Sequence, residues 1–291
     1  MDTIKLHGFT LERQPAPPVK LAEAYSDTAL RLSSAPMPGI VAHRDVAWGP
    51  ERWQRFDVFA PTGAKKALPV LIFLHGGGWV VGWKEWGGFM APAVAAAGAI
   101  LVCPTYRLAP THRFPTFLED CLDAVAAVKQ RIGELGGDAR QIYIGGHSAG
   151  GHLAAMVGFR RDLWRGRIGK ELRGLLPVSG ILDLVHENPT PESLEAAVYS
   201  TVLASPGDDV GASPVTYAAS LRMKMLLAWG ENDSQRVKDS NDRMAVALSQ
   251  AGRPFEEMKL AGLDHFGTHL ALQDAAHPWY GVLSRWIAED A

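Results

Sequence analysis

Short apolar runs separate longer mixed stretches along most of this chain, and this alternation predicts strands separated by helices. Most of the later runs are apolar without a break, which is typical of parallel strands covered on both faces. The strands are expected at residues 42–47, 55–60, 69–74, 100–105, 142–145, 174–178, 225–229 and 255–260. The helices are expected at residues 89–97, 115–135, 149–159, 191–204, 234–251 and 278–289.

This order of elements predicts an α/β fold built on one open sheet. Right-handed crossovers place successive strands parallel, with helices on both faces. The first strands are shorter and more mixed, so we expect an antiparallel start to an eight-stranded, mostly parallel sheet. Functional loops of such a sheet follow the carboxyl ends of its strands.

A G-H-S-A-G string at residues 146–150 directly follows one apolar run. The pattern is that of a nucleophile elbow, a sharp strand-to-helix turn that exposes the hydroxyl of Ser148. Glycines on either side leave room for the turn to close, and the next helix directs its positive end at the serine. The pattern alone is weak evidence, because a chain with 30 glycines can produce it by chance.

A second string, H-G-G-G-W at residues 75–79, follows another apolar run. Three glycines at the end of a strand expose backbone N–H groups, and two such donors aimed at one point form an oxyanion hole. A phosphate-binding loop is the alternative, but the chain lacks the G-K-[ST] ending and the G-x-G-x-x-G pattern here. The two strings together favour a serine nucleophile.

An acid is expected between the serine and a later histidine, because a serine hydroxyl needs an imidazole base whose tautomer a carboxylate fixes. The apolar run at residues 223–229 ends in G-E-N-D-S, and we expect Asp233 to be the acid. Glu231 is the second choice and Asp183, after the preceding strand, is the third. Helix capping is the alternative role for Asp233.

The histidine is expected after the last strand, where His265 lies in a G-L-D-H-F-G loop. His269 and His277 follow it and are the alternatives. His147 and His152 flank the elbow, where packing or a local hydrogen bond is the usual role. A metal site built from them would need further ligands that the sequence does not supply.

Three tryptophans, Trp79, Trp83 and Trp86, follow the glycine string closely. We predict that they line an apolar or aromatic substrate pocket. The alternative is that they pack a lid against the sheet, since tryptophan packs well wherever its N–H finds a partner.

Composition narrows the range of partners. A net charge of −2 and a pI near 6.6 give no electrostatic footprint for nucleic acid or an anionic membrane. The two cysteines have no disulfide or zinc-site spacing. The N-terminus has no apolar leader core and the chain has no run of about eighteen apolar residues, so we expect a cytoplasmic protein. No metal or organic cofactor is expected, and a homodimer stays open.

Taken together, these strings resemble the α/β-hydrolase fold. The H-G-G-G-W-V-V-G string and Y-R-L-A-P at residues 106–110 are similar to hormone-sensitive-lipase-like carboxylesterases. The longer G-H-S-A-G-G-H-L string and the D-H-F loop at residues 264–266 are similar to kynurenine formamidase (arylformamidase)-like hydrolases. The resemblance covers roughly residue 41 to the C-terminus.

The resemblance implies Ser148, Asp233 and His265 as a catalytic triad. It also implies that the oxyanion hole is formed by three backbone N–H groups, those of Gly77, Gly78 and Ala149.

The expected reaction is attack by Ser148 on the carbonyl of a small or aromatic ester, through an acyl-enzyme that water releases. Arylformamidase activity is the alternative, although kynurenine formamidases often carry a tyrosine where this chain has Gly78. A ligand-binding protein without catalysis is the third hypothesis, because fold does not determine function. Such proteins usually lack the nucleophile or the histidine.

The first forty residues differ from the rest because they are rich in proline and polar residues, with a short helical stretch at residues 21–32. We interpret residues 1–40 as a lid or wrapping segment and residues 41–291 as the catalytic domain. At 291 residues, 47% of them hydrophobic, the chain requires no second core.

Overall fold

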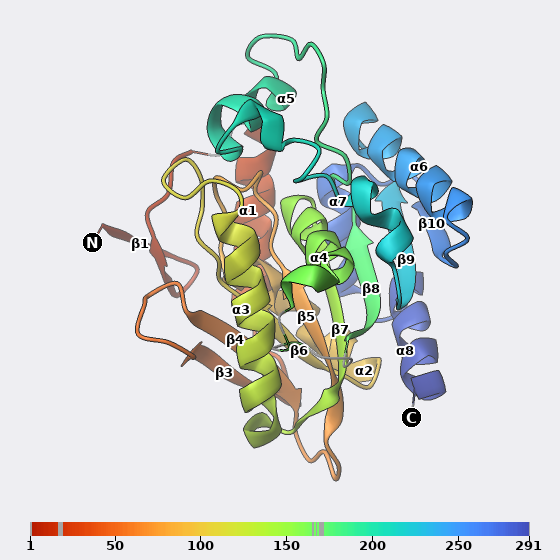
Figure 1. The fold of residues 1–291 in the computed structure, drawn as a ribbon. Coiled ribbons are helices and arrows are strands. Elements are labelled where there is room, and N and C mark those ends of the chain that lie inside the picture. Colours follow the sequence, from red (N-terminus) through yellow and green to blue (C-terminus); the bar gives the residue numbers. More distant parts are fainter. Residues whose placement is uncertain (1, 17–19, 165, 167, 169–171, 291) are drawn as a thin grey trace.

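The computed structural model describes residues 2–16, 20–164, 166, 168 and 172–290. Eight strands form one sheet in the order β10-β9-β8-β7-β5-β6-β4-β3 (Figure 1). Their bounds are β3 (Ile40–Ala47), β4 (Arg55–Pro61), β5 (Leu68–Leu74), β6 (Ile100–Pro104), β7 (Gly137–His147), β8 (Leu172–Val178), β9 (Lys224–Gly230) and β10 (Glu256–Leu260). β3 pairs antiparallel with β4 and β4 with β6, and all other pairs are parallel, which confirms the predicted sheet.

Helices cover both faces of this sheet (Figure 1). One core contains residues of α3 (Thr116–Arg131), α4 (Ala149–Phe159) and α6 (Gln235–Gln250). The opposite core contains residues of α1 (Lys20–Ser34), α2 (Ala91–Ala96) and α8 (Pro278–Asp290). Alternate residues of β5 enter the two cores, which explains why its sequence is apolar throughout.

The N-terminal segment contains a hairpin that the sequence pattern did not predict. β1 (Thr3–Leu6) and β2 (Phe9–Glu12) pair antiparallel in a sheet of their own. His7 and Gly8 between them have φ values of 49° and 85°, and a two-residue type I′ turn requires both to be positive. The predicted helix at residues 21–32 is present as α1, whereas residues 17–19 lie outside the described part.

Two predicted helices are less regular than expected. The one at residues 191–204 is a short α5 (Leu194–Ala197) followed by a π-helical turn, Val198–Val202. β-Branched residues and Ser200 in that turn disfavour a regular helix. The one at residues 89–97 begins as the 3₁₀ helix Lys84–Met90 and continues as α2. A further helix, α7 (His265–Leu270), was not predicted and begins at the candidate histidine.

No helix of the described part is long and apolar enough to cross a membrane. Among the same residues, no group of three or more histidine, cysteine or carboxylate side chains is arranged to hold a metal ion. Both cysteines are buried and free.

Candidate active site

Ser148 occupies the sharp turn between β7 and α4, with φ 56° and ψ −120°. This is a strained conformation for a residue with a side chain, and the surrounding packing enforces it. A Cβ at Gly150 would collide with the carbonyl oxygens of Leu74 and His75, and one at Gly146 with that of Gly150. The glycines of the string are therefore required by the close approach of the backbone, and they leave the Ser148 hydroxyl at the carboxyl end of the sheet.

His265 lies between the serine and a buried carboxylate. Its Nε2 is 2.9 Å from the Ser148 hydroxyl, and its Nδ1 is 2.8 Å from an Asp233 oxygen. An ionised carboxylate only accepts hydrogen bonds, so Nδ1–H donates to Asp233 and the Nε2 lone pair accepts the serine O–H. The structure therefore brings the three predicted residues into one continuous relay.

Asp233 is 4% exposed, and its Oδ1 accepts from His265 Nδ1 and from the backbone N–H of Ser234. Burial raises its pKa, but hydrogen bonds from His265 and Ser179, the positive field of His265 and the backbone N–H of Ser234 outweigh that effect. The pKa of Asp233 therefore lies below its ordinary value. The group is ionised at neutral pH, as a partner that fixes a histidine tautomer must be.

The competing acids and the capping role do not fit the geometry. Glu231 accepts a hydrogen bond from the backbone of Gly262, and Asp183 pairs with Arg243 at 2.7 Å. The N-cap of α6 is Ser234, whose hydroxyl accepts from the first turn, and not Asp233.

The competing histidines are also placed elsewhere. His269 Nδ1 bonds the hydroxyl of Tyr25 at 2.7 Å, and burial lowers the pKa of His269 to about 3. His277 lies at the start of α8, where its Nδ1 accepts from the backbone of Trp279.

The glycine loop after β5 turns back beside the elbow. Gly77 and Gly78 have φ values of 109° and 61°, and a Cβ at Gly77 would collide with the Val81 carbonyl. The Tyr106 hydroxyl donates to the His75 carbonyl at 2.7 Å, and the two rings stack at 4.2 Å. Burial lowers the pKa of His75 to about 4, so this ring is neutral.

Gln14 of the N-terminal segment holds the far end of the glycine loop. Its side-chain amide donates to the Gly82 carbonyl at 2.8 Å and accepts from the Gly82 N–H at 2.6 Å. This reciprocal pair links residues 68 positions apart, and no local pattern in the sequence indicated it.

Trp79 and Trp86, which are predicted to line a substrate pocket, are both buried. Trp79 is 2% exposed and its indole N–H donates to His152 at 3.2 Å, while Trp86 is 1% exposed and donates to Ser26 of α1. Trp79 thus contacts α4 and Trp86 contacts α1, and a substrate role for these two residues also remains a prediction. Trp83 is half-buried and donates to the Glu12 carbonyl, and a substrate role for it remains a prediction.

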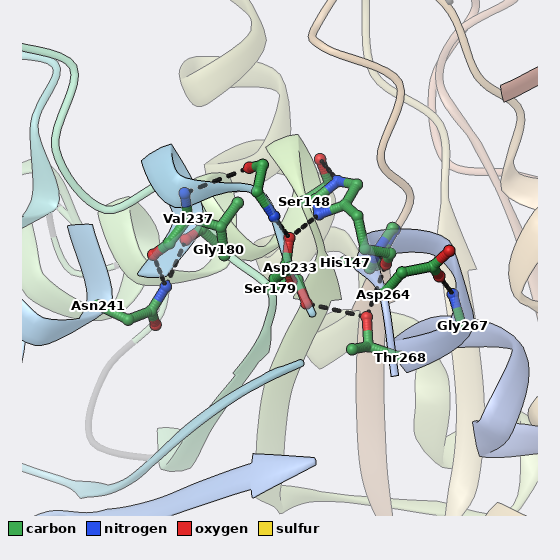
Figure 2. Close-up of polar contacts among 12 residues, drawn as sticks. His147, Ser148, Ser179, Gly180, Asp233, Val237, Asn241, Asp264, Gly267 and Thr268 are labelled. Carbon is green, nitrogen blue, oxygen red and sulfur yellow. Dashed lines mark hydrogen bonds and ion pairs between the residues drawn. The ribbon is translucent and has the colours of Figure 1, made fainter. Parts of the chain in front are cut away.

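Two hydroxyl residues behind the histidine were missed by the sequence analysis. Thr268 donates to the His265 carbonyl at 2.7 Å, and Ser179 lies 2.8 Å from the Thr268 hydroxyl (Figure 2). Ser179 follows β8 in a V-S-G string for which no catalytic role was predicted, and Thr268 is one helical turn after His265. Both contacts depend on the order of the strands.

A family model described as alpha/beta hydrolase fold matches residues 71–269. This chain belongs to the alpha/beta hydrolase fold family. The match covers β5 to α7 and so includes the glycine loop, the elbow and the loops that carry Asp233 and His265.

Several relatives are similar over most of the chain. The kynurenine formamidase of Danio rerio is 28% identical over 84% of this chain and 82% of its own length. The kynurenine formamidase of Salmo salar is 30% identical, with 76% and 74% covered. The isoprenylcysteine alpha-carbonyl methylesterase of Arabidopsis thaliana is 27% identical over 79% of this chain, which spans only 57% of that relative's length. The chain also spans only 59% of a related rice protein.

Among solved structures, the hyperthermophilic esterase of Pyrobaculum calidifontis superimposes with a TM-score of 0.76. The two chains are 22% identical, and 94% of each is covered. The similarity extends beyond the family match and confirms the fold.

Proposed function

We propose that this protein is a serine hydrolase that cleaves a carboxylic ester of a small or aromatic substrate. The observation that carries the proposal is the hydrogen-bonded relay from Ser148 through His265 to Asp233. Membership of the alpha/beta hydrolase fold family and the relatives named as esterases support it.

In the proposed mechanism, the Ser148 oxygen bonds to the substrate carbonyl carbon while its proton passes to His265 Nε2. Asp233 stabilises the imidazolium that forms. His265 then gives the proton to the leaving alkoxide, the ester C–O bond breaks, and an acyl group remains on Ser148. A water molecule repeats the sequence, with His265 as its base, and releases the acid.

The negative charge that develops on the substrate oxygen requires preorganised donors. We assign this role to the N–H groups of Gly77, Gly78 and Ala149. The first two donate to no acceptor among the residues that the structure describes. Ala149 is the first residue of α4, where an N–H has no partner within the helix.

Hydrolysis of an aryl formamide is the second candidate. The kynurenine formamidases of two fishes align with about three quarters or more of this chain, and most of their own length is covered. The same serine, histidine and oxyanion donors could cleave an activated amide, since the chemistry of acyl transfer is shared. A ligand-binding role without catalysis is weaker, because the chain retains all three members of the relay.

The deciding experiment compares hydrolysis of p-nitrophenyl acetate, butyrate and octanoate with that of N-formylkynurenine. Wild type and Ser148→Ala are measured in parallel, with Ser249→Ala on the exposed side of α6 as a matched control. We expect Ser148→Ala to lower kcat on the esters by about 10⁶, and the control to leave it unchanged.

Serine-dependent turnover of the formamide alone would move the assignment to an arylformamidase. Absence of any serine-dependent turnover would contradict the hydrolase proposal and favour a ligand-binding role.

We also propose that residues 1–40 wrap the catalytic domain of residues 41–291. Contacts from Gln14 to the glycine loop and from Tyr25 to α7 support this division. A small-molecule ester or amide is the proposed partner.

A further inference from the structure

His147, the residue before the nucleophile, lies between the glycine loop and the catalytic histidine. Its side chain is 1% exposed, and its ring centroid is 4.8 Å from that of His265. A Cβ at Gly76 would lie 3.2 Å from His147 Nδ1, so the ring also packs against the first glycine of the loop. One side chain thus contacts both the proposed oxyanion loop and the proposed base.

The contact with the base is a hydrogen bond to its backbone. His147 Nε2 is 2.8 Å from the His265 carbonyl oxygen, which can only accept, so His147 carries its proton on Nε2. Among the described residues, Nδ1 has no hydrogen-bond partner. A histidine in this place therefore acts as a single, directed donor.

The surroundings keep this ring neutral. Burial, together with the neighbouring rings of His265 and His269, holds the pKa of His147 well below the ordinary histidine value. His269 stacks on His147 with centroids 5.1 Å apart and planes 13° apart, and the Tyr25 ring lies 5.8 Å away. A charged His147 would oppose the imidazolium that forms on His265 during the reaction, because like charges at this distance repel strongly in a buried site.

A second donor reaches the same carbonyl. The Thr268 hydroxyl donates to the His265 oxygen at 2.7 Å, and the Ser179 hydroxyl lies 2.8 Å from that of Thr268. The carbonyl thus accepts from two directions, from the residue beside the nucleophile and from α7. Two donors fix the peptide plane, and the peptide plane fixes the position from which the imidazole reaches Ser148.

We propose that His147 is a positioning residue for His265, which sets the distance and angle between the imidazole and the Ser148 hydroxyl through its bond to the His265 carbonyl. The inference rests on the proposed serine-hydrolase function. It also accounts for a polar side chain within the elbow that touches no reacting atom. His147 and Thr268 share the acceptor, so the effects of losing each are expected to depend on the other.

The test compares His147→Phe, which keeps a ring but removes the donor, with His147→Gln, whose amide nitrogen can take the place of Nε2. Thr268→Val and the double variant His147→Phe/Thr268→Val complete a cycle. Each is assayed for kcat and KM on p-nitrophenyl acetate, and thermal unfolding reports folding separately.

We expect His147→Phe to lower kcat about 10- to 100-fold with KM within about threefold, because a misplaced base slows the chemical step. His147→Gln should recover most of kcat. The fold-loss of kcat in the double variant should differ from the product of the fold-losses in the two single variants.

Several results would overturn the inference. One is a kcat of His147→Phe within twofold of wild type, and another is His147→Gln failing as badly as His147→Phe while remaining folded. Strictly multiplicative single effects would also contradict the shared acceptor. If His147→Phe does not fold, His147→Gln and Thr268→Val decide the question: wild-type kcat for Thr268→Val would overturn it.

Failure of the function proposal is distinct, since wild type would then show no turnover that depends on Ser148.

Discussion

The loops at the carboxyl end of the sheet and the N-terminal segment contribute to the site in different ways. The sheet loops carry the groups proposed to react, Ser148, Asp233 and His265, which bond one another directly. The N-terminal segment touches none of these three by a hydrogen bond within the described part, but it bonds the ends of two loops that carry or flank them. Gln14 pairs with Gly82, and Tyr25 bonds a histidine of α7.

This difference teaches that some of the contacts that hold the groups proposed to react come from a separate part of the chain. The glycine loop is anchored at one end by β5 and at the other by Gln14. α7 is anchored by the sheet through Ser179 and by α1 through Tyr25. Changes in the sheet loops should therefore affect the chemical step, and changes in the segment should affect geometry and stability.

Among the variants that test this comparison, Asp233→Asn, on the sheet side, is expected to have the largest effect. An amide at this place can donate to His265 Nδ1, which forces the histidine proton onto Nε2, where it blocks acceptance of the serine proton. We expect kcat to fall about 10⁴-fold. Glu231→Gln in the same loop is the matched control, and its kcat should stay within about twofold. A small loss for Asp233→Asn would mean that another group fixes the tautomer.

Tyr25→Phe tests the segment's hold on α7. Tyr25 is 4% exposed, and removal of its hydroxyl leaves the buried His269 Nδ1 without its hydrogen-bond partner. We expect a loss of about 1–3 kcal/mol in the free energy of unfolding, measured by urea denaturation. The kcat should change by no more than about threefold. If Tyr25→Phe had the same unfolding free energy as wild type, this bond would not hold the segment to the domain.

The pH dependence of stability tests whether the two regions unfold together. Burial lowers the pKa of His152, in the core, to about 4 and that of His269, beside the segment, to about 3. Above pH 6.5 both groups are neutral whether the chain is folded or unfolded. As the pH falls from 6.5 toward 4, only the unfolded chain gains these protons, so the unfolding free energy falls by about 1.4 kcal/mol per pH unit for each group.

Urea unfolding at pH 7, 6 and 5 measures this slope. His152→Gln and His269→Gln should each reduce it by about 1.4 kcal/mol per pH unit if segment and core unfold as one unit. If only His152→Gln reduced the slope, the core and the N-terminal segment would not unfold as one unit.

The smallest expected effect is that of Gln14→Ala, which removes both bonds to Gly82. We expect kcat to fall about three- to tenfold, less than the 10²–10³ that loss of one oxyanion donor typically costs, because the donors stay in place but are held less firmly. Gln14→Glu keeps the acceptor for the Gly82 N–H and should lose less. An unchanged kcat for Gln14→Ala would mean that the contact of the N-terminal segment with Gly82 does not affect the chemical step.

Local patterns predicted most of the fold and the identity of the relay. All eight strands of the main sheet were located from apolar runs, and the runs of the six strands from β4 to β9 fill two cores at once. The β1–β2 hairpin was missed because its strands are short and only Leu11 is buried in a core, with Ile4 and Phe9 partly buried against it. The stretch around α5 was predicted as one helix because it begins with helix-forming residues. Only Leu194–Ala197 form a regular α-helix, and the β-branched residues that follow form a π-helical turn.

The sequence by itself determined what the backbone must do locally. The glycines beside Ser148 and in the glycine loop lie in turns that only glycine permits. The order of serine, acid and histidine along the chain indicated which residues could meet. The tertiary structure alone decided which side chains touch across long separations. Tyr25 and His269 are 244 residues apart, and His147 bonds a carbonyl 118 residues away. Such contacts leave no periodic or local pattern, because they depend on the order of the strands and not on the residues that flank them.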